Sequence, residues 1–234
     1  CRQNDVSELK SLLETIETTN SIKQRIKNAS FNNLDVIEVF NQLERDVDFG
    51  FVNHRLEIMH WKGDLTLNFL SENGIIKYGW ISEYKSTNKK LAGPVAFKDS
   101  PNFLCDYISK HNNYYGSNLT EKDFEEQMLT DYVVGFGCGF SGAEISKESK
   151  ASLRYSDNRN IKKLNEFLTS VSPELQTLGV IGLLKIGIIN QKQKKIISHL
   201  KDRNSSINSC AGCIYGIGET FNERIEQYET NASK

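Results

Sequence analysis

Two cysteines, Cys210 and Cys213, form the single Cys-x-x-Cys of the chain. A pair with this spacing at the start of a helix is typical of redox proteins, because the helix N-terminus lowers the pKa of a thiol. Together with Cys138 and either Cys105 or a histidine such as His199, the pair would make a zinc site. It would also form a structural disulfide, either internally or with Cys138. The spacing therefore fits redox, metal-binding and structural roles.

The sequence around the pair favours a structural role. A thioredoxin-like redox pair needs a strand followed by a helix, which the predicted elements do not provide. A zinc site needs a second close pair of ligands, whereas His54 and His60 are six residues apart in a predicted strand region. Free cysteines also pack as small hydrophobic residues. We expect a structural disulfide or buried thiols, with redox chemistry at Cys210 and Cys213 as the alternative.

Other residue types that act in catalysis stand without a recognisable motif. The glycine-rich segment from Gly135 to Gly142 lacks the lysine of a phosphate-binding loop and does not follow a predicted strand. Its glycines suit a helix end or close helix packing better. No Ser–His–Asp or paired-carboxylate arrangement is evident, and an isolated histidine is usually structural or solvated. We therefore predict no catalytic residues, no metal site and no cofactor.

Four aromatic residues of the predicted strand region form a candidate interaction surface. They are Trp61, Tyr78, Trp80 and Tyr84. The alternative is that these rings cover the buried face of the sheet, and we favour it, because large aromatic side chains usually supply core packing.

The cysteine pair lies in the second of two similar phrases, SPELQTLGVIGLLKIG from Ser172 and SSINSCAGCIYGIG from Ser205. With an offset of 32 residues, Leu178 matches Cys210 and Leu183 matches Tyr215. A period of this length indicates stacked helical hairpins. The phrase INSCAGCIYGIG resembles the first helix of a HEAT-like repeat. The resemblance implies a HEAT-like α-hairpin repeat at about 172–221, with Cys210 at a buried position.

The rest of the chain changes its hydrophobic period twice. Apolar residues recur at three- and four-residue spacing from Asp5 to Asn28 and again after Asn33, which predicts helices. Between Phe51 and Tyr84 the pattern alternates, which predicts a three-stranded antiparallel meander with a hairpin turn at Asn73-Gly74. Helical patterns return after Ser100.

These patterns predict an α+β fold that is mostly helical, with a small antiparallel sheet of about three strands. The expected divisions are an N-terminal tether with helices (1–48), a small β region (49–98) and a helical region with the repeat (99–234).

Composition excludes some classes of function. The 234 residues have a formal net charge of -1, so no basic excess indicates a nucleic-acid partner. No apolar run approaches the roughly 18 residues that cross a bilayer.

The sequence begins with Cys1, followed by a polar leader. A mature chain that starts at a cysteine resembles a bacterial lipoprotein, and the alternative is that Cys1 marks an arbitrary boundary. Gly137-Cys138-Gly139 and Cys210-Ala211-Gly212-Cys213, with the predicted helix and strand order, resemble a group of uncharacterised bacterial lipoproteins. The resemblance implies lipid on Cys1, loss of a signal peptide, membrane anchoring through that lipid, and a periplasmic or surface-exposed place in the cell envelope.

We therefore expect a non-enzymatic module that binds a protein partner, such as an inhibitor or immunity-type lipoprotein. Stacked helical repeats present surfaces suited to such partners. The alternative is a thiol–disulfide redox protein.

Overall fold

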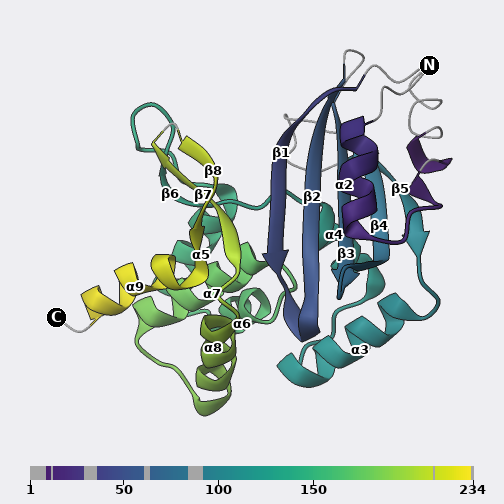
Figure 1. The fold of residues 1–234 in the computed structure, drawn as a ribbon. Helices are drawn as coiled ribbons and strands as arrows, with labels where there is room; N and C mark the ends of the chain where they lie inside the picture. The colour runs from purple at the N-terminus through teal and green to yellow at the C-terminus, as the bar shows by residue number, and fades with distance from the viewer. Residues whose placement is uncertain are drawn as a thin grey trace. The chain divides into compact units, whose positions relative to one another are not determined.

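The computed structural model describes residues 9–11, 13–28, 36–60, 64–83, 92–212 and 214–232. The chain forms two compact units (Figure 1). The first comprises residues 1–108 and 128–131, and the second comprises residues 109–127 and 132–234. The chain thus enters the second unit, returns briefly to the first, and then completes the second.

The first unit is built on a five-stranded antiparallel sheet whose strands follow one another in sequence order. They are β1 (Val36–Asp46), β2 (Phe51–His60), β3 (Leu65–Glu72), β4 (Ile75–Glu83) and β5 (Ala92–Asp99), with the short 3-10 helix η1 (Asp48–Gly50) between β1 and β2. The predicted hairpin at Asn73-Gly74 is confirmed, because both residues have positive φ (51° and 78°) between β3 and β4.

The two faces of this sheet differ in character. Helix α2 (Thr19–Asn28) lies against one face (Figure 1), where its Ile22 joins a core with Leu56 and Phe69 from the strands. Because side chains alternate along a strand, the neighbours of these residues point to the opposite face. There Asn53, Arg55 and Asn68 lie beside buried apolar residues such as Trp80, the register partner of Asn68. We call this the polar face, because its Asn53 and Asn68 are buried polar residues.

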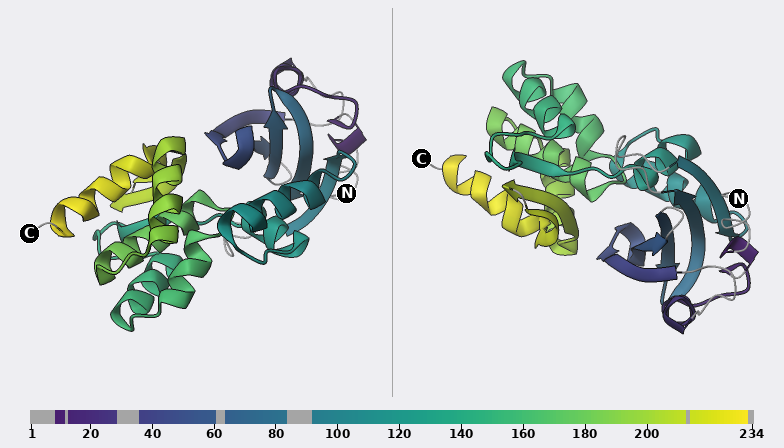
Figure 2. Two further views of the ribbon diagram at one scale, coloured as in Figure 1. Left: turned by 90° about the horizontal axis from the view of Figure 1, so that it is seen from below. Right: turned by 90° about the horizontal axis from the view of Figure 1, so that it is seen from above.

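The second unit combines helices with a three-stranded sheet. Its helices are α5 (Lys147–Asp157), α6 (Ile161–Leu168), α7 (Pro173–Ile186), α8 (Gln191–Arg203) and α9 (Phe221–Ala232). It also contains the end of α3 (Phe103–Tyr115) and the start of α4 (Glu121–Leu129). The strands are β6 (Val134–Cys138), β7 (Ser206–Gly212) and β8 (Ile214–Thr220). β6 pairs in parallel with β7, and β8 is antiparallel to β7. Figure 2 shows the green helices and the yellow C-terminal helix α9 beside this sheet.

Helix α7 is the centre of this unit, since every residue from Pro173 to Leu183 is buried. Ser172 caps its start, Pro173 occupies the first turn, and Gly187 ends it in the left-handed conformation. Its apolar residues share a core with Leu164 of α6 and Leu200 of α8.

The prediction of a mostly helical fold with about three strands is wrong. The sheet of the first unit has five strands, and the second unit has a further three. One added strand, β1, falls in the segment predicted to be helical after Asn33. Its Val36, Ile37 and Val39 are β-branched and favour a strand, whereas the spacing of Ile37, Phe40 and Leu43 also fits a helix.

The HEAT-like hairpin at 172–221 is also wrong. Its first phrase is helix α7, but its second forms the β-hairpin β7–β8. Three glycines in the second phrase (Gly212, Gly216 and Gly218) disfavour a helix, while Ile207, Ile214, Tyr215 and Ile217 favour strands. The match at an offset of 32 therefore joins two different kinds of element.

In the parts of the chain that the structure describes, no helix has both the length and the hydropathy of a membrane span.

Candidate functional site

A disulfide joins Cys138, at the end of β6, to Cys210 on the neighbouring strand β7. The two Cα atoms are 5.4 Å apart, and each cysteine is only 3% exposed. Both pack with Val133 in a small apolar cluster. Of the alternatives open from the sequence, the structure contains the disulfide between Cys210 and Cys138. Cys213 lies outside the described residues, as does Cys1.

The strands leave very little space beneath this bond. Gly135 of β6 is the register partner of Cys210, and a Cβ at Gly135 would overlap both sulfur atoms. The glycine-rich segment thus forms a strand beside a disulfide, and not the helix end that its sequence suggested.

A short loop, residues 139–144, follows Cys138, and we call it the Phe140 loop. The Cys138 N–H donates to the Glu144 carbonyl at 2.7 Å, and the Glu144 N–H donates back to the Cys138 carbonyl at 2.9 Å. Inside this pair, the Gly142 N–H donates to the Gly139 carbonyl at 2.9 Å. Gly139 and Gly142 have φ values of 79° and 64°, which residues with side chains rarely adopt. The loop is therefore a closed turn that depends on its glycines.

The tip of this turn exposes a large apolar side chain. Phe140 is 99% exposed, whereas the next most exposed large hydrophobic residues of the described chain, Ile188 and Tyr114, are 53% and 47% exposed. An aromatic ring held in water on a closed turn has no role in packing its own fold. Sequence reasoning missed Phe140, although its place between paired glycines was a usable signal for a turn.

The base of the Phe140 loop is held by buried serines. Ser146 caps helix α5, and its hydroxyl donates to the Val133 carbonyl at 2.7 Å. The Gly135 N–H donates to the Ser149 hydroxyl at 3.0 Å. Together with the disulfide, these bonds fix both ends of the loop on the sheet and on α5.

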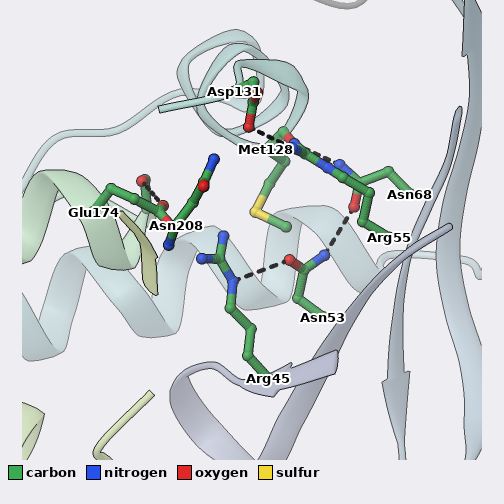
Figure 3. A network of polar contacts seen from close by, with 9 residues as sticks. Arg45, Asn53, Arg55, Asn68, Met128, Asp131, Glu174 and Asn208 are labelled. Carbon is green, nitrogen blue, oxygen red and sulfur yellow. Dashed lines mark hydrogen bonds and ion pairs between the residues drawn. The ribbon is translucent and has the colours of Figure 1, made fainter. Parts of the chain in front are cut away.

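A separate polar network occupies the polar face of the first unit (Figure 3). The Arg45 Nε–H donates to Asn53, whose amide donates to Asn68 at 2.8 Å, and Asn68 in turn donates to the Met128 carbonyl. Arg55 pairs with Asp131 at 2.9 Å and also donates to the Met128 carbonyl. These bonds hold residues 128–131 on the sheet, so the network has a structural role.

The described members of the predicted aromatic surface pack inside the first unit. Trp80 is buried, and the half-buried Tyr78 contacts it edge-on with the ring centroids 4.6 Å apart. Tyr78 also stacks on Phe103. Of the rings that we expected to be buried, Trp80 is buried and Tyr78 is half-buried, while Trp61 and Tyr84 lie outside the described residues.

Two buried histidines have structural partners. His54 contacts Ser71 at 2.9 Å and stacks on Phe69, and His111 contacts the Ser170 carbonyl and stacks on Tyr115. Within the described residues, no group of three or more His, Cys, Asp or Glu side chains is arranged to hold a metal ion.

The groups with shifted pKa values are two carboxyls at helix starts and one partly buried tyrosine. Hydrogen bonds from Thr120 lower the pKa of Asp123, and hydrogen bonds from Thr220 lower the pKa of Glu223. Burial raises the pKa of Tyr228, which packs on Phe136 of β6.

Comparison with protein-family models, with curated proteins and with solved structures found no match to this chain. Function is therefore inferred from the chain's own residues, and the Phe140 loop is the candidate functional site.

Proposed function

We propose that this protein acts outside the cytoplasm as a non-enzymatic binding protein that recognises a protein partner through the Phe140 loop. The observation behind this proposal is the fully exposed Phe140 on a turn closed by hydrogen bonds and anchored beside a disulfide. Aromatic side chains that enter a pocket on a partner contribute much of the binding energy of protein interfaces.

The closed turn also favours tight binding. A flexible loop loses conformational entropy when it binds, and this loss reduces its affinity. The Cys138–Glu144 hydrogen-bond pair and the Cys138–Cys210 bond restrict the loop before it meets a partner. An inhibitor or immunity-type module that inserts a loop into the concave site of a secreted toxin or hydrolase would use this arrangement.

The disulfide supports the proposed compartment. Disulfides form and persist in oxidising environments such as the periplasm and the cell surface, and they are rare in the cytosol. The bond between Cys138 and Cys210 is buried, as expected for a bond that serves the fold.

The redox alternative needs an accessible thiolate, because the thiolate is the reactive form. Cys210 instead has a buried sulfur bonded to Cys138. Thiol counting tests this point: the native protein should keep the Cys138–Cys210 bond in mild reductant and release these two thiols only on unfolding. Rapid reduction of the native bond would favour redox chemistry.

Site-specific photo-crosslinking tests the binding role. A benzophenone amino acid replaces Phe140 in one variant and Ile188, which is also exposed, in a control variant. In cell-envelope extract of the source organism, we expect a discrete adduct from position 140 and none from position 188. Phe140→Ala as an untagged competitor should suppress the adduct much less than the wild-type protein does. Equal crosslinking from both positions, or equal competition by both proteins, would contradict the proposal.

A further inference from the structure

A cavity of about 660 Å³ lies within the second unit, well away in sequence from the Phe140 loop. Three segments line it: residues 115–119 at the end of α3 and just after it, part of α6 with the residue that follows it (Lys162, Asn165, Glu166, Leu168 and Thr169), and the start of α8 (Asn190, Lys192, Gln193 and Ile196). Its volume falls in the range of about 300–1,000 Å³ that is usual for small-molecule sites. The cavity has no part in the packing of the disulfide or of the five-stranded sheet.

Two lysines from different helices line this cavity. They are Lys162 of α6 and Lys192 of α8. Neither ammonium group has an ion-pair partner among the residues that the structure describes. Lys192 Nζ lies against Gly116, where an added Cβ would overlap the ammonium group. Gly116 therefore leaves the room that this cation occupies.

The single acid of the lining does not offset these two charges. Glu166 pairs with Lys163 on the preceding turn of α6, with 2.6 Å between Lys163 Nζ and Glu166 Oε2. The carboxylate is thereby neutralised locally, and the cavity keeps an excess of positive charge. Such an excess attracts an anion and disfavours a cation.

The remaining lining is apolar with a few amide groups. The half-buried Leu119 and the 4% exposed Ile196 supply apolar surface. The Gln193 amide donates to Asn165 Oδ1 at 2.8 Å, so the Asn165 Nδ2 hydrogens are not used in that bond. A ligand that fits this lining has an apolar body and an anionic group that accepts hydrogen bonds.

We infer that this cavity binds a small organic anion in which a carboxylate is attached to an apolar group. The carboxylate pairs with Lys162 and Lys192, and the apolar group lies against Leu119 and Ile196. This site is independent of the Phe140 loop, so failure of either proposal leaves the other in place.

An NMR titration of the full chain tests the inference. N-acetyl-phenylalanine is the probe, and its uncharged amide is the matched control ligand. We expect the acid to shift backbone amides in residues 115–119, 162–169 and 190–196, and the amide to bind at least about tenfold more weakly, which corresponds to about 1.4 kcal/mol. Added salt should weaken binding of the acid.

The matched variants are Lys162→Gln/Lys192→Gln and Lys150→Gln/Lys194→Gln, since Lys150 and Lys194 are exposed and lie outside the cavity lining. The first should lose at least about tenfold in affinity, and the second should bind like wild type. Equal binding of acid and amide, equal loss in both variants, or no shifts up to about 10 mM ligand would overturn the inference. The same shifts with inorganic phosphate but not with the acid would also overturn it, in favour of a phosphate site.

Discussion

Asn68 and Thr66 are buried polar residues two positions apart on β3, and so they share one face of the sheet. Their hydrogen bonding differs. Asn68 accepts from Asn53 and donates to the Met128 carbonyl, whereas the Thr66 hydroxyl has no hydrogen-bond partner among the described residues. Substitutions at these two residues therefore compare how a hydrogen-bonded and an unpaired buried polar group affect the free energy of unfolding.

We expect Asn68→Ala to lower the free energy of unfolding by about 3 kcal/mol. The substitution leaves the buried Asn53 amide without its acceptor, and such groups are costly in a folded interior. Thr66→Val, in contrast, should leave this free energy unchanged or raise it by about 1 kcal/mol. Urea denaturation followed by tryptophan fluorescence measures both. If Thr66→Val lowered the free energy of unfolding as much as Asn68→Ala does, the Thr66 hydroxyl would have a hydrogen-bond partner, contrary to this prediction.

At the scale of elements, two glycines let α7 approach its neighbours closely. A Cβ at Gly179 would lie 2.5 Å from the Leu168 backbone nitrogen, whereas a Cβ at Gly182 would meet the Leu164 side chain and the Ser152 hydroxyl. Backbone atoms of a packed helix end move less readily than side chains. The Ser152 and Ser156 hydroxyls donate to the Leu178 and Gly182 carbonyls of α7, each at 2.7 Å, and thereby bind α5 to it.

We therefore expect Gly179→Ala to lower the free energy of unfolding by about 3 kcal/mol and Gly182→Ala by about 1.5 kcal/mol. Circular dichroism during chemical denaturation provides both values. The reverse order would show that α6 and α7 separate more easily than the Leu164 and Ser152 side chains rearrange.

The start of α4 has a capping interaction that depends on pH. The Thr120 hydroxyl and N–H donate to the Asp123 carboxylate at 2.6 and 2.9 Å, and these bonds lower the pKa of Asp123 below its ordinary value of 3.8. A carboxyl group with a lowered folded-state pKa stabilises the fold above its unfolded pKa. It loses this contribution as the pH falls through the folded value.

Thr120→Val removes the hydroxyl and should raise the pKa of Asp123 toward its ordinary value. The difference in the free energy of unfolding between wild type and Thr120→Val should narrow as the pH falls below about 4. At low pH the Asp123 carboxyl becomes protonated in both proteins, so its interaction with Thr120 no longer distinguishes them. NMR titration of the side-chain carboxyl carbons measures the pKa. Thr220→Val is the control, since Thr220 caps α9 through Glu223 and should leave Asp123 unchanged.

Elements with local signals were predictable. The Asn73-Gly74 turn and the helix over the first phrase, from Ser172, depend on neighbouring residues, and both are present. β1, β6 and the β7–β8 hairpin were missed. Pairing with β7, far along the chain, decides β6, whereas β1 and β7–β8 pair with their neighbours in sequence but have an apolar spacing that also fits a helix. Short apolar runs such as those around Ile37 and Cys210 fit both periods until the partner strand is known.

The candidate site was only partly predictable for the same reason. A disulfide between Cys138 and Cys210 was among the alternatives, but choosing it requires β6 and β7 to be neighbours across 72 residues of sequence. Exposure of Phe140 likewise depends on the turn that β6 leads into. The cavity between α3, α6 and α8 joins three separate segments, and its lysines have no motif.

At the scale of the whole molecule, the disulfide stabilises one of the two units. Closing a loop of 72 residues restricts the unfolded chain and contributes about 4 kcal/mol in the entropic model. Both cysteines belong to the second unit, and both tryptophans of the chain belong to the first. Tryptophan fluorescence therefore reports on the unit without the disulfide.

We expect Cys138→Ser/Cys210→Ser to reduce hydrogen-exchange protection across β6–β8 while the fluorescence-detected unfolding of the first unit stays within about 0.5 kcal/mol of wild type. Cys105→Ser, which removes an exposed free thiol, should change neither signal. A large loss in the fluorescence transition would show that the two units unfold as one.

The brief return of residues 128–131 to the first unit has a consequence for synthesis on the ribosome. Asn68 finds its acceptor on Met128, 60 residues later, and Arg55 finds Asp131 76 residues later. A nascent chain that has emerged only as far as Ile108 holds all five strands but leaves both groups to water. The first unit is thus completed only after part of the second has been translated, and a gene fragment that stops at the end of α3 encodes a sheet with an unfinished polar face.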